Sequence, residues 1–472
     1  MALTDTLFLF LFLPVSLLVC LLNYRMQKYF LLLLSLVFYA CGSPSCFIMF
    51  VLLVILDVIL AYLIRLDLAV SRGVLIAGIV LNAGALFYFK YFEFVLSTLN
   101  QIFGSGFAVN DLMLPLGISF FSFKAISLLV DVYKKEVDLP KNPVYAALYL
   151  SFFGQVLSGP ITCYNEFYKY YKPKILDRKM AFKRIESGSI LFIRGFVKKI
   201  LLADVLGKIA LETFRTTQGT SSAFLWLGSI CYTLQLYYDF SGYSEMAIGV
   251  GRIFGIHSEP NFRYPYLTAS VSEFWSRWHI SLGKWFRKYV YFPLGGSRVE
   301  KRSRLFFNLF VVWALTGIWH GANWTFIVWG LFYFAVIAFE KAVGLPKKIP
   351  WAGVRVLYRI PVLLFINFQW VLFNSPDIAS GFRYIAGMFT AKNSLADIRT
   401  GVLFGQYKVF IIAGILFAMP IVPALRKLVS HLPKKGKMGA QITMAGTLAV
   451  LFIFAVSFVI AGNNDPFLYG NF

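Results

Sequence analysis

Charged residues are scarce in this sequence of 472 residues. Only 14% of its residues are Asp, Glu, Lys or Arg, whereas about 25% is usual in a soluble domain. Hydrophobic residues reach 59% and aromatic residues 18%. This composition argues against an ordinary soluble enzyme. It suits helices that face lipid, with aromatic rings at the membrane interface.

Acidic residues are especially scarce. The chain has 22 Asp and Glu against 45 Lys and Arg, a formal net charge of +23. In a soluble protein this excess would suggest nucleic acid as a partner. Here the basic residues form short clusters between apolar runs, as in cytoplasmic loops that face anionic headgroups. We therefore expect membrane lipid, and no nucleic acid, as the partner of this charge.

Several features that carry chemistry in other proteins are missing. The five cysteines are odd in number and scattered through apolar contexts, so we expect small buried side chains and neither a disulfide framework nor a metal site. There is no glycine-rich phosphate loop, zinc-ligand spacing or serine nucleophile elbow. We expect no metal and no tightly bound cofactor. No internal repeat is visible, which leans away from transport.

Apolar segments near the roughly 20 residues that cross a membrane are abundant. We place spans at about 6–23, 28–41, 46–64, 73–98, 113–133, 186–203, 221–240, 304–320, 324–340, 360–373, 408–425 and 440–460. They predict an all-α, polytopic membrane protein with about 11 or 12 crossings. We expect one domain over 1–472, with a motif-bearing core at 114–340 and C-terminal helices at 360–472. The first stretch lacks a basic flank and a cleavage site, so we expect a retained span.

The basic loops orient these spans. Placing them in the cytoplasm makes the crossings alternate and puts both termini outside. The exception is 144–160, an apolar stretch between two basic loops, where a further crossing would break the alternation. We expect this stretch to re-enter the membrane and to close at Gly159 and Pro160. Non-helical backbone at that depth must be buried in protein or line a cavity.

Only four histidines are present, and one has an unusual setting. His257 and His431 lie in polar or basic loop-like contexts, where we expect a solvated or interfacial side chain. His320 lies near the middle of 305–339, which contains no Asp, Glu, Lys or Arg. An ionisable group at membrane depth is costly and usually faces a cavity or a partner.

The neighbours of His320 allow two interpretations. Gly317 and Gly321 leave room for a substrate or for another backbone. Trp319 lies beside it, and we expect Asn323 to supply an amide near the imidazole. The histidine is then either functional, or structural and bonded to a carbonyl of another helix.

His279 lies in an aromatic and basic segment, 273–288. On one helix this segment would be amphipathic and would lie in the membrane interface. Its basic side chains are also candidates for binding the phosphates of an anionic donor through charge-assisted hydrogen bonds. These side chains are Arg277, Lys284, Arg287 and Lys288.

Two carboxylates stand at the ends of apolar spans. Asp239 is followed by Ser241 and Gly242, which we expect to break its span, and Asp204 is a similar case. Such a carboxylate either pairs with a basic residue or orients a histidine. A purely structural ion pair that joins two helices fits the sequence equally well.

A deep histidine without a nucleophile motif suits general-base catalysis. A neutral imidazole takes the proton from a hydroxyl as that oxygen attacks a thioester. Such a base contributes about 10²–10⁴-fold to the rate, and the positioning of two substrates would supply much of the rest.

Seven segments together carry a family resemblance. They are LPLGISFFSF at 114–123, SGPI at 158–161, FVKKILLAD at 196–204, YDFSGYS at 238–244, EFWSRWHISL at 273–282, LGGSR at 294–298 and GIWHGAN at 317–323. In this order they resemble the membrane-bound O-acyltransferases, and within them the bacterial branch that acetylates alginate and peptidoglycan. The D-alanyl transferase of teichoic acid is a related branch.

The resemblance implies a fold and a reaction. The family fold is a ring of helices, with re-entrant or interfacial helices around a central funnel that opens to both sides near the histidine. His320 matches the catalytic histidine, His279 the second histidine, and Asp204 an aspartate that the alginate branch requires. The implied donor is acetyl-CoA from the cytoplasm, and the implied acceptor is an extracytoplasmic glycan, often reached through a partner of the SGNH-hydrolase type. The implied location is the bacterial cytoplasmic membrane, with the aromatic tail 465–472 outside.

One departure leaves the substrate open. Lys124 follows the first motif where the alginate branch is expected to have Glu or Gln. The alternative is transfer of D-alanine or another acyl group from a carrier-protein thioester to a cell-wall polymer. A more remote alternative is a transporter that uses His320 in a proton relay.

Overall fold

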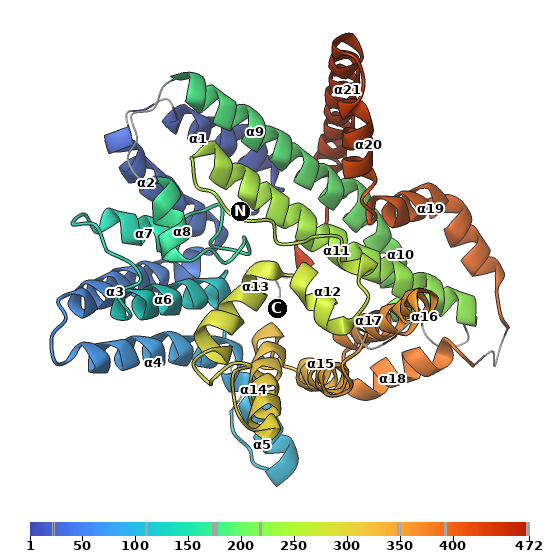
Figure 1. The fold of residues 1–472 in the computed structure, drawn as a ribbon, viewed down its shortest axis with the longest axis horizontal. Coiled ribbons are helices and arrows are strands. Elements are labelled where there is room, and N and C mark those ends of the chain that lie inside the picture. The colour runs from blue at the N-terminus through green and yellow to red at the C-terminus, as the bar shows by residue number, and fades with distance from the viewer. Residues whose placement is uncertain are drawn as a thin grey trace. The chain divides into compact units, whose positions relative to one another are not determined.

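The computed structural model describes residues 1–468 except 21, 23, 109–111, 172–177, 217–219, 347–348, 350 and 391–393. These residues form helices and connecting segments, and no β-strand occurs among them (Figure 1). The all-helical fold is therefore confirmed. By its internal contacts the chain divides into two compact units, one of 1–193 with 243–260 and one of 194–242 with 261–468.

Unit 1 contains the N-terminal helices. They are α1 (Leu13–Val19), α2 (Tyr24–Gly42), α3 (Phe47–Arg65), α4 (Ser71–Lys90), α5 (Phe92–Phe103), α6 (Ile118–Tyr133), α7 (Val144–Ser151), α8 (Tyr164–Tyr171) and most of α9 (Arg178–Val197). A π-helical turn, Phe8–Phe12, precedes α1. Its rings pack with Phe38 and Phe153 in an aromatic core, since close-packed apolar surface stabilises the interior.

Unit 2 contains the candidate site. Its helices are α10 (Asp204–Arg215), α11 (Ser222–Ile253, shared with unit 1), α12 (Val271–Arg277), α13 (Ile280–Phe286), α14 (Arg302–His320), α15 (Trp324–Val343), α16 (Ala352–Leu357), α17 (Arg359–Asn374), α18 (Ile378–Gly387), α19 (Ile398–Phe417), α20 (Ile421–Ser430) and α21 (Lys434–Ile460). Its core is rich in tryptophan, and Trp278, Trp329 and Trp370 are fully buried.

Five helical segments of the described chain are long and apolar enough to cross a membrane. They are Pro44–Arg65, Ser71–Lys90, Trp324–Val343, Ile398–Phe417 and Lys434–Ile460. Phe8–Val19 and Arg359–Asn374 are apolar but shorter. The polytopic character is thus confirmed, whereas the count of 11 or 12 crossings and the ring of helices stay predictions.

Several predicted spans have different ends in the structure. The span at 73–98 is wrong as one helix, because α4 ends at Lys90 and α5 begins at Phe92. The span at 408–425 is divided in the same way between α19 and α20. The break expected at Ser241 and Gly242 does not occur, because α11 continues to Ile253.

The ambiguous stretch 144–160 is part helix and part turn. α7 covers only Val144–Ser151, about 12 Å at 1.5 Å per residue, which is too short to cross a bilayer of about 30 Å. The following turns, 152–159, are almost completely buried, as non-helical backbone at membrane depth must be. The stretch is therefore not a single membrane-crossing helix, and its re-entry into the membrane stays a prediction.

Helices α14 and α15 form a tightly packed pair. A Cβ atom on Gly317 would lie 2.6 Å from the carbonyl oxygen of Phe326, and one on Gly330 would lie 2.6 Å from that of Trp313. Small residues allow helices to approach this closely. Of the two uses considered for Gly317, the structure therefore shows the approach of another backbone.

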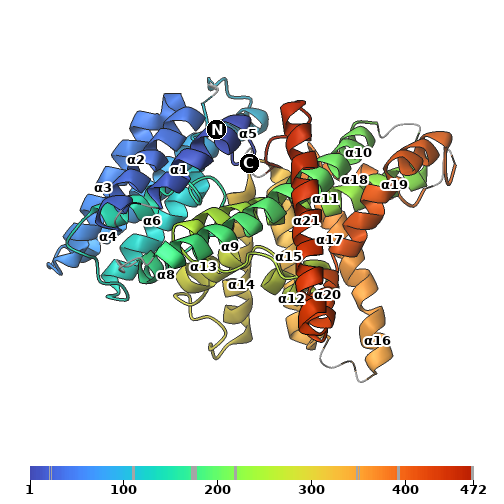
Figure 2. The ribbon, with the colours of Figure 1, turned by 90° about the horizontal axis from the view of Figure 1, so that it is seen from above.

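Two basic connections of unit 2 share one side. The loop before α14 and the turn between α20 and α21 lie along the lower edge of Figure 2. This arrangement is what the positive-inside rule would require of loops in one compartment.

Candidate active site

His320 is the last residue of α14. The chain then becomes extended at Gly321 and enters α15 after Asn323, whose side chain accepts a hydrogen bond from the Thr325 N–H at 2.9 Å. This cap satisfies one of the free N–H groups at the start of α15. The sharp turn between the two helices therefore fixes the position of the imidazole.

The side-chain amide of Asn323 binds backbone groups. Besides capping α15, its Nδ2 donates to the carbonyl oxygen of Pro376 at 3.0 Å. The amide expected beside the imidazole is thus directed at two backbone groups. It joins the α14–α15 turn to the start of α18.

Aromatic rings enclose the imidazole of His320. Its centroid lies 4.8 Å from that of Trp329 and 5.3 Å from that of Phe373, and both rings are edge-on to it. The Trp319 ring lies 5.0 Å away. Three different segments, α14, α15 and α17, therefore supply the walls around this residue.

His279 lies at a break between α12 and α13. Its backbone is left-handed, with φ of 44°, which is unusual for a residue other than glycine. The single amphipathic helix expected over 273–288 is therefore wrong: α12 ends at Arg277 and α13 starts at Ile280. Asn261 holds the start of α13, because its carbonyl oxygen and Oδ1 accept from the N–H groups of Ile280 and Ser281, each at 3.0 Å.

Both histidines lie against the ring of the same tryptophan, Trp319. The Trp319 ring lies 6.0 Å from His279 and 5.0 Å from His320 between centroids. Phe240 also packs against His279, with its ring centroid 4.6 Å from that of the imidazole and its plane almost perpendicular to it. Histidines from two distant parts of the sequence are thus brought into one aromatic cluster.

Both imidazoles are enclosed. His279 is 1% exposed and His320 is 2% exposed, and the ring nitrogens of both are inaccessible to water. Aromatic side chains pack against both rings, and the funnel expected beside His320 stays a prediction. Burial lowers the pKa of the His279 imidazole to about 3, because a charged ring would lose its hydration.

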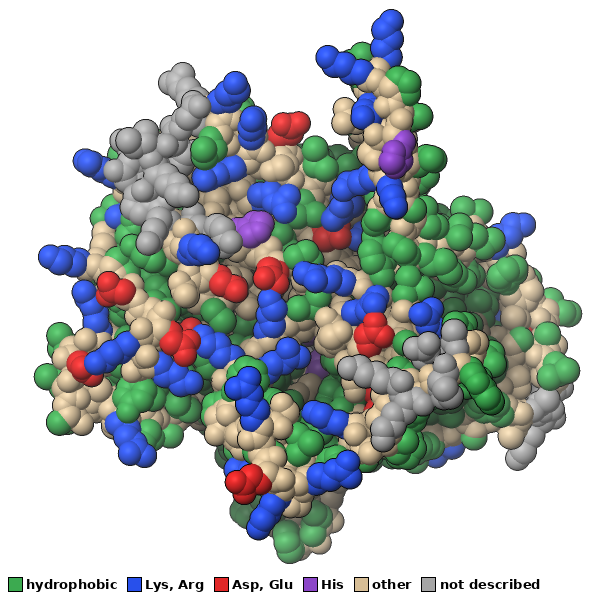
Figure 3. Space-filling view, in the orientation of Figure 1, with side chains coloured by type: hydrophobic (Ala, Val, Ile, Leu, Met, Phe, Trp, Pro, Cys, Tyr) green, Lys and Arg blue, Asp and Glu red, His purple; other side chains and the backbone are tan. Residues whose placement is uncertain are grey.

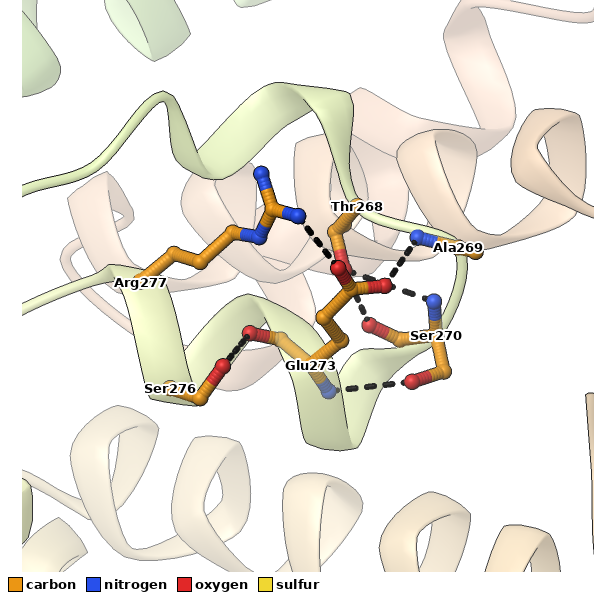
Figure 4. Close-up of polar contacts among 6 residues, drawn as sticks. All are labelled: Thr268, Ala269, Ser270, Glu273, Ser276 and Arg277. Carbon is orange, nitrogen blue, oxygen red and sulfur yellow. Dashed lines mark hydrogen bonds and ion pairs between the residues drawn. The ribbon is translucent and has the colours of Figure 1, made fainter.

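A capping box starts α12 and fixes the segment before His279 (Figure 4). The Ser270 hydroxyl accepts from the Glu273 N–H at 2.9 Å, and the Glu273 carboxylate accepts from the Ala269 N–H at 2.8 Å. The first bond satisfies an N–H group that the first helical turn leaves free, and the second ties Glu273 to the residue before the N-cap. Burial raises the pKa of Glu273, but the bonds from Ala269 and Arg277 outweigh it and hold the pKa below its usual value.

Glu340, near the end of α15, binds the same helix start. Its carboxylate is buried and accepts from the N–H groups of Val271 and Ser272 at 2.7 and 2.9 Å, and from the Ser272 hydroxyl at 2.7 Å. A negative charge is favourable at a helix N-terminus. The sequence analysis missed this residue, although its position next to Lys341 at the end of an apolar run resembles the setting of Asp239.

The four basic candidates differ in surroundings. Arg277 forms an ion pair with Glu273. Lys284 and Arg287 are exposed, and Lys288 is partly buried. In Figure 3, Lys and Arg side chains are spread over the face seen in Figure 1, with hydrophobic side chains exposed between them.

The carboxylates of Asp204 and Asp239 share one cation. Lys199 Nζ lies 2.7 Å from Asp239 Oδ1 and also pairs with Asp204. Pairing with a basic residue, one of the two uses considered for Asp239, is therefore what the structure shows. Lys199 was not among the candidates, although a lysine inside the apolar run at 196–204 was the available signal.

Ser241 and Gly242 lie one turn along from this ion pair. Ser241 is buried, and its hydroxyl has no hydrogen-bond partner in the described part of the chain. A Cβ atom on Gly242 would lie 2.7 Å from the carbonyl oxygen of Gly195. Gly242 therefore lets α11 pack directly against the end of α9, where a π-helical turn, Lys198–Ala203, carries Lys199.

Lys124 lies in unit 1 within a buried polar cluster. It donates to Gln155 at 3.3 Å and lies 4.5 Å from the centre of the Tyr149 ring. Gln155 in turn donates to Ser258 at 3.0 Å. The residue that departs from the expected pattern is thus held by hydrogen bonds inside the protein.

The remaining predictions for cysteine and histidine have mixed outcomes. His257 and His431 are exposed, as expected. Cys20, Cys46 and Cys231 are buried, but Cys41 is exposed and Cys163 partly exposed, so the expectation of burial is wrong for these two. Among the described residues, no three His, Cys, Asp or Glu side chains form a group that could hold a metal ion.

Comparison with known proteins identifies the family. Residues 79–380 match the model of the membrane-bound O-acyltransferase family. The chain is 33% identical to the probable alginate O-acetylase AlgI of Azotobacter vinelandii over the full length of both. It is 32% identical to the peptidoglycan O-acetyltransferase of Helicobacter pylori, over 99% of this chain and 96% of that protein. Identity to the teichoic acid D-alanyltransferase of Bacillus subtilis is 28%, over 56% and 68%.

The chain therefore belongs to the membrane-bound O-acyltransferase family. It is an integral membrane protein and an acyltransferase, as the seven motifs predicted. A transporter is no longer a competing interpretation.

Proposed function

We propose that this protein transfers an acetyl group from cytoplasmic acetyl-CoA to hydroxyl groups of an extracytoplasmic polysaccharide, directly or through a partner of the SGNH type. The names of the two full-length relatives, an alginate O-acetylase and a peptidoglycan O-acetyltransferase, support acetyl transfer to a glycan. The observation that carries the proposal is the buried His320, which shares Trp319 with a second buried histidine.

In the proposed reaction His320 is the general base. Its imidazole takes the proton from the acceptor hydroxyl while the hydroxyl oxygen attacks the thioester carbonyl carbon. A C–O bond forms, the C–S bond breaks, and the thiolate leaves and receives the proton. The aromatic walls exclude water, which limits hydrolysis of the thioester.

His279 and the basic side chains of 273–288 are proposed to position and attract the acyl donor. With a pKa of about 3, His279 is neutral at physiological pH, so it positions a substrate as a neutral hydrogen-bonding group. Lys284 and Arg287 are exposed and are suited to attract the phosphates of the coenzyme. Arg277 and Lys288 complete this proposed surface.

The enclosed site must open for catalysis. Since neither imidazole is accessible to water, we expect an aromatic side chain of the enclosure to change its rotamer when the substrates bind. Phe373 is suited to this movement because it lies in the last turn of α17, beside the non-helical Ser375.

The test is the O-acetyl content of cell-surface glycans in cells with His320→Ala. We expect the variant to reach the membrane in normal amounts and to lose about 10²–10⁴-fold of its activity. The control is His431→Ala, because His431 is exposed between α20 and α21. Normal glycan O-acetylation with His320→Ala, measured by mass spectrometry, would refute the proposed base.

A carrier-bound donor is the second candidate. The similarity to a teichoic acid D-alanyltransferase favours it. Incubation of the purified protein with labelled acetyl-CoA separates the two donors. Absence of coenzyme release and of label transfer, with the partner present, would favour the carrier-bound donor.

A further inference from the structure

Three ionisable side chains of unit 2 are buried together. Lys199, Asp204 and Asp239 are each at most 2% exposed. One lysine faces two carboxylates, so the group keeps a net negative charge when all three are ionised. A buried carboxylate is stable only when its oxygens have donors. Lys199 contacts Oδ1 of each aspartate, which leaves both Oδ2 atoms to be satisfied.

The C-terminal segment supplies those donors. The N–H of Asp465 donates to Asp204 Oδ2 at 3.3 Å, and the N–H of Leu468 donates to Asp239 Oδ2 at 3.0 Å. Both donors are backbone groups of the segment that follows α21. The ion-pair cluster therefore binds the backbone of this chain segment.

The same segment is connected to His279 through two aromatic rings. Phe467 is buried, and its ring lies 5.8 Å from that of Phe240. Phe240 directly follows Asp239 in α11 and packs edge-on against His279 at 4.6 Å. One face of the enclosure around His279 is thus supported by the C-terminal segment.

Packing holds this imidazole. In the described part of the chain neither ring nitrogen of His279 has a hydrogen-bond partner, and its backbone is in the left-handed region. A ring without hydrogen bonds keeps its orientation only through its neighbours. Loss of support behind Phe240 would let the imidazole turn away.

We propose that Lys199, Asp204 and Asp239 form a docking site for the C-terminal segment 464–468, and that this segment positions His279 through Phe467 and Phe240. The cluster is a set of positioning residues, remote from the reacting atoms. The effect on turnover rests on the proposed function, whereas the docking itself does not.

The docking is tested with a pair of substitutions at one residue. Leu468→Pro removes the N–H that donates to Asp239, and Leu468→Ala keeps it. The readout is the rate at which diethyl pyrocarbonate modifies His279 in the full-length protein in membranes, with the exposed His431 as internal reference. We expect modification about tenfold faster or more in the proline variant, since local opening limits the reaction, and near the unmodified protein's rate in the alanine variant.

A second pair tests the ring contact and keeps both backbone bonds. Phe467→Ala removes the ring, and Phe467→Leu replaces it with a smaller apolar side chain. We expect Phe467→Ala to expose His279 to the reagent and to lower kcat with little change in KM, and Phe467→Leu to restore part of both. Such rescue separates positioning from a general loss of folding, which would lower expression of the protein instead.

The outcomes distinguish the docking from the proposed function. Equal modification of His279 in Leu468→Pro, Phe467→Ala and the unmodified protein would overturn the docking. Faster modification together with unchanged turnover would support the docking and contradict the proposed role of His279.

Discussion

At the scale of single residues, His279 combines burial with neutrality. Its pKa of about 3 lies below the ordinary value of 6.5, so the unfolded chain binds a proton between these values and the folded protein does not. Stability therefore falls as the pH decreases below about 6.5. Protonation of His279 inside the aromatic cluster therefore destabilises the folded protein.

This linkage predicts the behaviour of His279→Gln. The substitution removes a titrating group, so the variant should lose less stability on acidification than the unmodified protein does, by about 1.4 kcal/mol per pH unit below the unfolded pKa. The measurement is the thermal midpoint in detergent at about pH 7.5 and about pH 5.5. The same acid sensitivity in both proteins would show that His279 takes up a proton in the folded state.

Gly242 makes a prediction about close packing. Gly242→Ala places a methyl group 2.7 Å from the Gly195 carbonyl oxygen and 3.1 Å from the Lys199 nitrogen, and neither backbone atom can move freely. We expect a loss of about 1–3 kcal/mol, measured as a lower thermal midpoint. Gly405→Ala in α19, where a Cβ meets nothing within 4 Å, is the matched control and should be neutral or stabilising.

At the scale of elements, α12 is too short to be stable alone. A helix of this length depends on its caps and its neighbours, which are Ser270 at the start and the Glu340 carboxylate of α15. Because His279 follows α12 closely, the same contacts set the position of its imidazole.

Glu340→Gln tests this anchor. The amide keeps the shape of the side chain but loses the charge that four donors share, and hydrogen bonds to charged groups contribute about 1.5–3 kcal/mol each. We expect a lower thermal midpoint and lower acyl transfer. Glu212→Gln removes a carboxylate from an exposed pair with Arg399 and should cost less than about 1 kcal/mol. Equal effects of the two variants would contradict the anchoring role.

At the scale of the whole molecule, the distribution of basic segments predicts the orientation in the membrane. The loop before α14 and the turn between α20 and α21 are basic and lie on one side (Figure 2), and loops of this kind remain in the cytoplasm. The proposed orientation therefore puts the turn between α20 and α21 inside and the end of α21 outside.

Cysteine labelling checks this orientation. Lys435→Cys and Asn463→Cys lie near opposite ends of α21, and the exposed Cys41 is replaced by serine to remove background. We expect an impermeant maleimide to label the second variant in intact spheroplasts and the first only after permeabilisation. Labelling of Lys435→Cys in intact spheroplasts would reverse the proposed orientation.

The sequence predicted the class of fold and singled out two histidines that the structure buries together, but it predicted few of the contacts around them. His320 was evident because charge is absent around it, and His279 because of its aromatic and basic neighbours. Glu340 and Lys199 were missed because their partners, the first turn of α12 and the carboxylates of α10 and α11, lie far away in the chain. Hydropathy measures segments one at a time, so it joined α4 with α5 and divided α11.

Composition alone determined that this protein lies in a membrane, and it made His320 a candidate for the site, because the cost of burying charge leaves few ionisable groups within apolar runs. Tertiary structure decided what those groups contact. It paired Asp204 and Asp239 with Lys199, placed both histidines on Trp319 and closed the aromatic rings around them. Such contacts depend on how helices pack against each other, and packing joins residues that no local pattern of sequence connects.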